Sequence, residues 1–196
     1  MIDKIDKDNM YKSILDFSDN ILDAVKLGDS IKFLNDYSSI NKIIVAGMGG
    51  SAIGGDVTYA LVNDEITIPY LVVRGYNIPT WVDSSTLVIC SSYSGNTEET
   101  LSAFNQCKQV GAKIVAMTTG GKLQELAIEC GLDYALLPAG LQPRAALGLS
   151  VSLTLIMLNR LGFASDAIIE ELYFSFEKLT GLCDELSDFD DANPAL

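Results

Sequence analysis

Five short apolar segments recur between residues 42 and 137, and longer segments with helical spacing of apolar residues separate them. The apolar segments cover residues 42–46, 68–73, 86–91, 113–117 and 134–137. Short, continuously apolar runs are typical of strands that are buried on both faces of a parallel sheet. Strands that alternate with helices build a doubly wound sheet. The pattern therefore predicts an α/β fold, a three-layer αβα sandwich around a five-stranded parallel sheet.

The helices of this sandwich can be placed from the same pattern. They are expected over residues 51–62, 97–109, 123–130, 145–161 and 166–182. Gly111 and Gly131 lie just beyond two of these segments, where glycine commonly ends a helix. Apolar residues between positions 8 and 34 predict one or two further helices, with Gly28 as a break.

The chain length sets the domain organisation. A chain of 196 residues can bury one sizeable core but not two full domains. We expect residues 1–40 to form helices that pack on the domain, residues 41–163 to form the ligand-binding core, and residues 164–196 to form a helix followed by an acidic linker. The acidic residues of this linker are Asp184, Glu185, Asp188, Asp190 and Asp191.

Charge and cysteine content exclude several classes of function. The 26 acidic and 13 basic residues give a net charge of -13, which would repel nucleic acid and an anionic membrane surface. The longest apolar stretch, residues 147–158, contains serine and threonine and is too short to span a bilayer, so it is interpreted as a buried helix. The four cysteines lack CxxC spacing and the chain has no histidine, which argues against a structural zinc site. Free thiols and the lack of an apolar signal core at the first residues are consistent with a cytoplasmic protein.

A glycine-rich turn, Gly47-Met48-Gly49-Gly50-Ser51-Ala52, follows the first strand. It matches the dinucleotide-binding pattern through Gly47, Gly49 and Ala52. An NAD-dependent enzyme usually carries an acidic residue at the end of the next strand, where this chain has Arg74, a residue that could instead meet the 2′-phosphate of NADP. A purely structural tight turn is the other alternative.

A serine-rich turn follows the third strand and is chemically more specific. Ser92, Ser94 and Thr97 place three hydroxyl groups within a six-residue span at a predicted helix start. Hydroxyls, backbone N–H groups and the positive end of the helix dipole together suit a phosphate dianion. The alternative is a helix cap, with Asn96 as N-cap and Glu99 completing a capping box. Because both turns lie at the carboxyl edge of the same predicted sheet, we expect a pocket for a small phosphorylated ligand.

Other polar residues near these turns have more than one interpretation. Glu98 and Glu99 are candidate proton-transfer groups, although acidic residues in a first helical turn more often complement the helix dipole. Arg144, in the loop after the fifth strand, could clamp a substrate oxygen or stabilise an oxyanion, or it could simply pin its loop. Tyr76 and Tyr93 are expected to be packing residues.

Three motifs, in this order, resemble those of the sugar isomerase (SIS) superfamily. More narrowly, they resemble the bifunctional phosphoglucose/phosphomannose isomerases of archaea and bacteria, most closely over residues 42–149. The motifs are Gly47-Met48-Gly49-Gly50-Ser51, Ser92-Tyr93-Ser94-Gly95-Asn96-Thr97-Glu98-Glu99-Thr100 and Gln142-Pro143-Arg144-Ala145-Ala146. Residues 73–79, after the second strand, agree with the same family.

The resemblance implies a flavodoxin-like SIS domain and roles for individual residues. Ser92, Ser94 and Thr97 would bind the 6-phosphate, Gly50 and Ser51 would contact the sugar, and Arg144 would stabilise the enediol(ate) intermediate. The implied reaction interconverts glucose 6-phosphate or mannose 6-phosphate with fructose 6-phosphate and needs no metal or other cofactor. The resemblance also implies a homodimer.

The chain departs from this family in one respect. Its members carry two SIS domains, and the second supplies the carboxylate base, a ring-opening histidine and a lysine. This chain has no histidine, so the resemblance implies a half-site that holds the phosphate but cannot complete the proton transfer. We expect the isolated chain to be inactive or nearly so, either as part of a longer isomerase or as a half that borrows the rest. A sugar-phosphate-sensing module without catalysis is the alternative.

Overall fold

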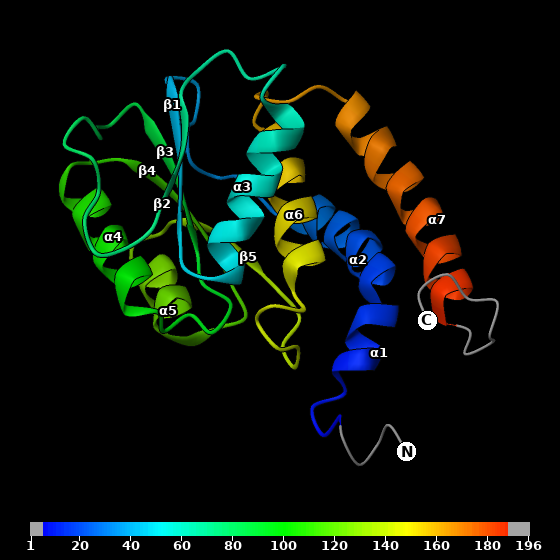
Figure 1. Ribbon diagram of the computed structural model, residues 1–196. Coiled ribbons are helices and arrows are strands. Elements are labelled where there is room, and N and C mark those ends of the chain that lie inside the picture. The colour runs from blue at the N-terminus through cyan, green and yellow to red at the C-terminus, as the bar shows by residue number, and fades with distance from the viewer. Residues whose placement is uncertain (1–5, 188–196) are drawn as a thin grey trace.

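A parallel five-stranded sheet forms the centre of the molecule (Figure 1). The computed structural model describes residues 6–187. Along the sheet the strands follow the order β2-β1-β3-β4-β5, and each neighbouring pair is parallel. The predicted α/β class and parallel sheet are confirmed. The strands are β1 (Lys42–Gly47), β2 (Tyr70–Val73), β3 (Thr86–Ser91), β4 (Lys113–Thr118) and β5 (Asp133–Leu136).

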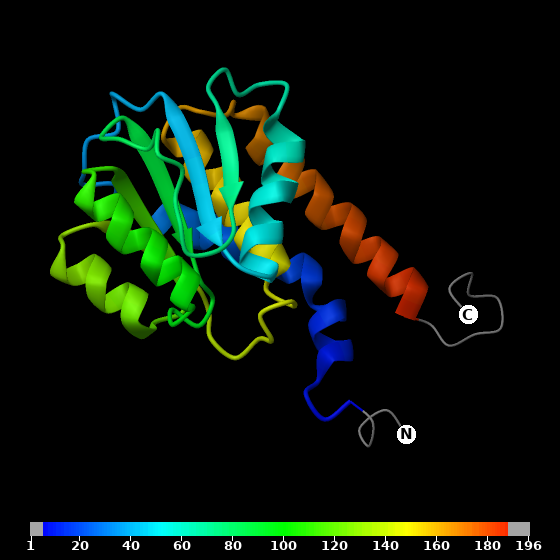
Figure 2. The ribbon, with the colours of Figure 1, turned by 60° about the vertical axis from the view of Figure 1, so that its left-hand side comes forward.

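Helices cover both faces of the sheet, as Figures 1 and 2 show. α4 and α5 cover one face, α2, α3 and α6 cover the other, and α7 packs against α2 and α6. The two helical layers and the sheet make the predicted three-layer sandwich. The helices are α1 (Met10–Leu15), α2 (Phe17–Ser30), α3 (Gly50–Val62), α4 (Glu98–Gln109), α5 (Gly121–Glu129), α6 (Leu147–Arg160) and α7 (Ala167–Ser187).

The strands are apolar on both faces because each face contacts a helical layer. In β1, Ile43 and Val45 belong to the core cluster beneath α2 and α6, whereas Ile44 belongs to the cluster beneath α4 and α5. This second cluster includes Cys90 and Cys107, and all four cysteines of the chain are free. Burial raises the pKa of the Cys107 thiol to about 12, so it behaves as a small hydrophobic residue rather than a nucleophile.

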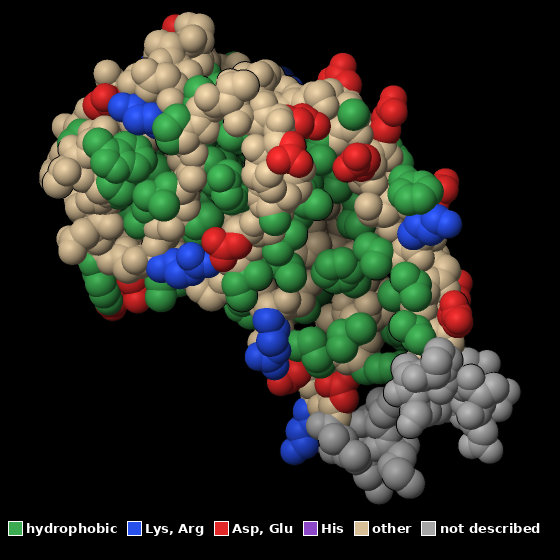
Figure 3. All heavy atoms as spheres, turned by 45° about the horizontal axis from the view of Figure 1, so that its top comes forward, with side chains coloured by type: hydrophobic (Ala, Val, Ile, Leu, Met, Phe, Trp, Pro, Cys, Tyr) green, Lys and Arg blue, Asp and Glu red, His purple; other side chains and the backbone are tan. Residues whose placement is uncertain are grey.

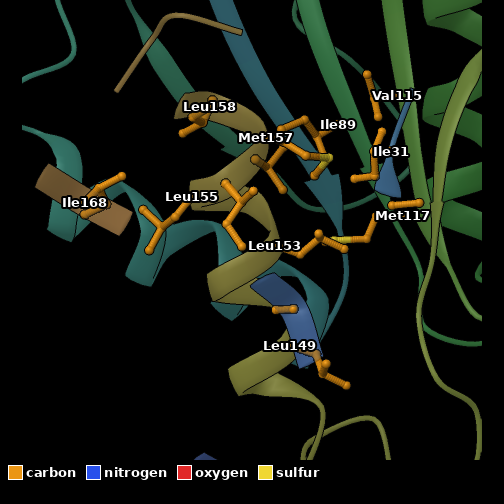
Figure 4. Packing of buried hydrophobic residues seen from close by; sticks show 14 of the residues in the cluster. Ile31, Ile89, Val115, Met117, Leu149, Leu153, Leu155, Met157, Leu158 and Ile168 are labelled. Carbon is orange, nitrogen blue, oxygen red and sulfur yellow. The ribbon is translucent and has the colours of Figure 1, made fainter. Parts of the chain in front are cut away.

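Helix α6 is surrounded by protein, which explains its almost continuous apolar sequence. Figure 4 shows Leu153 and Met157 directed toward the sheet and Leu155 directed toward Ile168 of α7. Of the polar residues within it, Thr154 donates a hydrogen bond of 2.7 Å to a carbonyl oxygen of the same helix. The interpretation of residues 147–158 as a buried helix is therefore confirmed. Between residues 6 and 187, no helix has the length and apolar character needed to cross a membrane.

Two expectations at the chain ends were wrong. Gly28 does not break a helix but lies inside α2, where a Cβ atom would come within 2.4 Å of the Ile156 side chain. It allows α2 and α6 to approach closely, and the break falls instead at Asp16. Helix α7 continues to Ser187, so Asp184 and Glu185 are helical rather than part of a linker. Asp188, Asp190 and Asp191 lie outside the described residues.

The strand order creates the position of the site. From β1 the chain crosses to β2 through α3 on one face, and from β3 it crosses to β4 through α4 on the other face. The carboxyl ends of β1 and β3 therefore flank a topological switch point, which is where open α/β sheets bind ligands. Figure 2 shows that the loop after β5 lies at the end toward which the strands point.

Candidate functional site

The glycine-rich turn after β1 runs close to the end of β3. A Cβ atom at Gly47 would lie 3.0 Å from the Ser91 carbonyl oxygen, so glycine permits the two strand ends to approach. Gly49 takes a positive φ of 53° and is the N-cap of α3, and no side chain caps this helix. The first N–H groups of α3 therefore remain without a side-chain acceptor at the switch point.

The hydroxyl groups of the second turn divide into two kinds. The Ser92 hydroxyl is buried, accepts the N–H of Gly95 at 3.1 Å and lies 2.8 Å from the Thr97 hydroxyl. Ser94 is exposed, and its hydroxyl accepts the N–H of Asn96 at 3.2 Å. The structure thus brings Ser92 and Thr97 together as the inner part of the turn and leaves Ser94 open to solvent.

Helix α4 begins at the end of this turn without a side-chain cap. Its N-cap is Thr97, so the alternative interpretation, with Asn96 as N-cap and Glu99 completing a capping box, is wrong. The Asn96 side chain instead accepts the N–H of Lys122 at 3.0 Å and joins the turn to the start of α5. As in α3, the first N–H groups of α4 lack a side-chain acceptor. Two helix N-termini therefore present positive dipole ends on either side of the switch point.

The loop that carries Arg144 contacts both turns. A Cβ atom at Gly50 would lie 2.9 Å from the Pro143 carbonyl oxygen, so the absence of a side chain there lets this loop lie against the start of α3. Arg144 itself is exposed, and between residues 6 and 187 its guanidinium has no hydrogen bond or ion pair. Arg144 is thus available to a ligand and does not pin its loop.

Tyr93 does pin this loop, which the sequence did not indicate. Its ring packs against the core cluster under α6, as expected of a packing residue, but its hydroxyl also hydrogen-bonds the backbone at Pro138 and Leu141. These partners are 45 and 48 residues away along the chain. No local sequence pattern predicts a contact over such a distance along the chain.

Two other charged residues near the turns, Glu98 and Arg74, already have partners. Glu98 accepts a hydrogen bond of 3.2 Å from the Tyr76 hydroxyl, and this contact raises the pKa of Tyr76. Arg74 forms an ion pair with Asp56 of α3. Its guanidinium is therefore already engaged by a carboxylate, which disfavours a role in binding the 2′-phosphate of NADP. Among residues 6–187, no group of three His, Cys, Asp or Glu side chains is arranged to hold a metal ion.

Charge over the rest of the surface offers no alternative anion site on the face that Figure 3 presents. The Lys and Arg side chains there are scattered rather than grouped. Several basic side chains pair with acidic ones, as Lys42 does with Asp83 at 2.7 Å. Together with the net charge of -13, this pattern fits a small anion bound by backbone N–H groups better than an extended polyanion.

Fold and geometry define a class of protein: a doubly wound α/β domain with uncapped helix N-termini and hydroxyl-rich turns at its switch point. Sequence comparison makes the assignment narrower. The SIS domain family matches residues 36–159, and the chain belongs to this family.

Two curated relatives that cover most of this chain share one name. The chain is 48% identical over 164 residues to the bifunctional phosphoglucose/phosphomannose isomerase of Caldicellulosiruptor bescii, covering 83% of this chain and 48% of that protein. It is 38% identical over 169 residues to the protein of the same name from Thermoplasma acidophilum, covering 85% and 48%. The chain therefore spans about half the length of these curated relatives.

A solved structure has the same fold. A putative phosphosugar isomerase from Clostridium difficile superposes with a TM-score of 0.63 at 20% identity, over 89% of this chain and 52% of that one. At this identity the likeness concerns the fold alone.

Proposed function

We propose that this chain binds a hexose 6-phosphate and supplies the phosphate-binding half of a site that isomerises glucose 6-phosphate or mannose 6-phosphate to fructose 6-phosphate. The observation that carries the proposal is the turn from Ser92 to Thr97, in which the hydroxyls of these two residues lie together at the uncapped start of α4. The two relatives described above are both named bifunctional phosphoglucose/phosphomannose isomerase, and this name supports the reaction class.

Within this proposal each segment has a chemical task. The hydroxyls of Ser92, Ser94 and Thr97 and the N–H groups of α4 hold the phosphate, while Gly50 and Ser51 contact the sugar. Binding of the remote phosphate contributes energy that orients the carbons C1 and C2. Moving a proton between these carbons produces an enediolate, and the unpaired guanidinium of Arg144 stabilises its negative charge.

The proton transfer itself needs a base and a ring-opening acid. We assign neither to this chain, because it has no histidine and Glu98 is hydrogen-bonded to Tyr76. Those groups come from a second domain, either of the same protein or of its partner in a homodimer. The isolated chain is therefore expected to bind the sugar phosphate without significant turnover.

The first test is calorimetric titration of the chain with glucose 6-phosphate, glucose and inorganic phosphate. We expect glucose 6-phosphate to bind, glucose to show no measurable binding, and inorganic phosphate to bind more weakly than the sugar phosphate. Turnover is then measured with the complete gene product by following fructose 6-phosphate formation. Binding without turnover in that product would favour a sensing function, and protection by NADP alone would favour the dinucleotide alternative.

Ser94→Ala tests the phosphate contact with little risk to the fold, because Ser94 is exposed. A hydrogen bond to a charged group contributes about 1.5 kcal/mol or more, so we expect the affinity for glucose 6-phosphate to fall roughly 10-fold. The measurement is the same calorimetric titration.

Ser84→Ala is the matched control, since Ser84 is an exposed serine before β3, at the opposite edge of the sheet. Its affinity should equal that of the wild type. Equal affinities in all three proteins would remove Ser94 from the phosphate site.

A further inference from the structure

Tyr93 occupies the phosphate-binding turn between Ser92 and Ser94, and its backbone is held firmly there. Its carbonyl oxygen accepts the N–H of Thr119 at 3.0 Å and the hydroxyl of the same residue at 2.7 Å. These two bonds attach the turn to the end of β4. The position of the Tyr93 ring is thus tied to the position of the phosphate-binding hydroxyls.

The Tyr93 hydroxyl contacts the loop after β5, which carries Arg144. It donates a hydrogen bond of 2.8 Å to the Pro138 carbonyl oxygen and accepts one of 2.9 Å from the Leu141 N–H. Between these two residues the chain reverses through Gly140, whose φ is 105°. A single hydroxyl therefore satisfies one backbone group at each end of the reversal.

Arg144 follows this reversal after only two intervening residues. The intervening segment is short and stiff, because Pro143 restricts it and the Ala145 N–H donates a 2.8 Å hydrogen bond to the Gln142 carbonyl oxygen. The Arg144 side chain has no hydrogen-bond or ion-pair partner between residues 6 and 187. The position of the loop backbone therefore determines the point from which this side chain extends.

We propose that Tyr93 is a positioning residue that fixes the distance between the phosphate-binding turn and Arg144, so that one sugar phosphate can contact both. This proposal rests on the proposed function of the site. It extends that function by making the phosphate end and the reacting end of the ligand depend on one hydrogen-bonding group. In this role Tyr93 acts through the loop backbone and does not itself contact the ligand.

Tyr93→Phe is a suitable variant because it retains the ring. The ring and Leu141 both pack against the core cluster under α6, and phenylalanine preserves that contact. Tyr134→Phe is the matched control, since Tyr134 is also partly buried and lies on β5, just before the loop. Both variants should unfold at a denaturant concentration close to that of the wild type.

Hydrogen exchange tests the structural half of the proposal without any ligand. In Tyr93→Phe we expect the amides of residues 139–146 to exchange roughly 5-fold faster, while those of the turn at residues 92–97 keep their wild-type rates. Tyr134→Phe should leave the loop unchanged. Loop exchange at the wild-type rate in Tyr93→Phe would overturn the proposal whatever the protein binds.

A double-mutant cycle tests the connection to Arg144. The probe is a phosphorylated hydroxamate, a planar anionic mimic of the enediolate, with inorganic phosphate as the reference ligand. Tyr93→Phe should weaken hydroxamate binding roughly 5-fold in the wild type and have no effect in Arg144→Ala, while leaving phosphate binding unchanged. The positioning role would be overturned if Tyr93→Phe weakened hydroxamate binding equally in the wild-type and Arg144→Ala backgrounds. It would also be overturned if the variant weakened hydroxamate and phosphate binding equally.

The two proposals fail differently. If the wild type binds neither the hydroxamate nor glucose 6-phosphate, the proposed function is wrong, and the exchange rates still decide whether Tyr93 holds the loop. If the wild type binds both and the cycle is additive, the proposed function stands and the positioning role of Tyr93 is wrong.

Discussion

Gly95→Ala is expected to lower the free energy of unfolding by about 2–5 kcal/mol and to abolish binding of hexose 6-phosphate. Gly95 has a φ of 71°, in the left-handed region that disfavours any residue with a Cβ atom. An added Cβ would also lie 1.8 Å from the Gly120 carbonyl oxygen. That oxygen cannot easily move, because it accepts a 2.8 Å hydrogen bond from the Thr118 hydroxyl. The turn must therefore open, which separates Ser92 from Thr97.

Gly111→Ala separates the cost of the positive φ from the cost of the contact with the Gly120 carbonyl oxygen. Gly111 has a similar φ of 76°, but the nearest atom to an added Cβ would be 4.0 Å away. It should therefore cost only the conformational penalty of about 1–2 kcal/mol and leave ligand binding unchanged. Urea unfolding followed by circular dichroism, with calorimetric titration of glucose 6-phosphate, gives both quantities. Equal destabilisation by the two variants would show that the contact with Gly120 is unimportant.

The fold was predictable because its signals are local. Apart from polar residues at their ends, such as Lys42, Thr86 and Asp133, the strands are apolar, since helices cover both faces of the sheet. The positions of all five strands follow from that pattern. The turns after β1 and β3 were equally visible, as glycine and serine interrupt the apolar pattern at the carboxyl end of a strand. The strand order then determines where the site lies, because it places these two turns beside each other.

The features that sequence reasoning missed depend on partners distant in the chain. Gly28 was interpreted as a helix break, but its role is set by Ile156 on another helix. Asn96 was considered as a cap, but its side chain bonds to the start of α5. Tyr93 was given only a packing role because Pro138 and Leu141 are not its neighbours in sequence. Roles of this kind are decided by tertiary contacts, which local patterns do not encode.

Asp133 also has a role that depends on partners distant in the chain. Replacing it should, like Gly95→Ala, strongly lower the free energy of unfolding. It is buried at the start of β5, with 4% of its surface exposed, at the edge of the sheet opposite the site. Its carboxylate accepts the N–H of Leu34 at 2.9 Å, the N–H of Asn35 at 3.1 Å and the hydroxyl of Tyr37 at 2.7 Å. These bonds hold the segment between α2 and β1 against the sheet.

Asp133→Asn should therefore lower the free energy of unfolding by about 2–4 kcal/mol near neutral pH. The amide presents an NH₂ group where the carboxylate presented an acceptor, so at least one of the three donors loses its partner. Tyr37→Phe removes one donor and leaves the charge, and it should cost only about 1 kcal/mol. Binding of glucose 6-phosphate should be unchanged in both variants, because the site lies at the other edge of the sheet.

The loss caused by Asp133→Asn should itself depend on pH. Burial acts to raise the pKa of Asp133, but the hydrogen bonds from Leu34, Tyr37 and Asn35 outweigh it and lower the pKa below its ordinary value of 3.8. A carboxyl group with a lowered pKa in the folded state stabilises the fold above its unfolded pKa, and this contribution disappears as the pH falls through the folded value. The difference in unfolding free energy between wild type and Asp133→Asn should thus be constant above about pH 5 and shrink steadily below about pH 4. Comparing the two proteins at each pH removes the contribution of other carboxylates, such as Asp83, whose pKa is also lowered by its bond to Lys42. A difference that stayed constant down to about pH 2 would mean that the Asp133 carboxylate does not stabilise the fold through its charge.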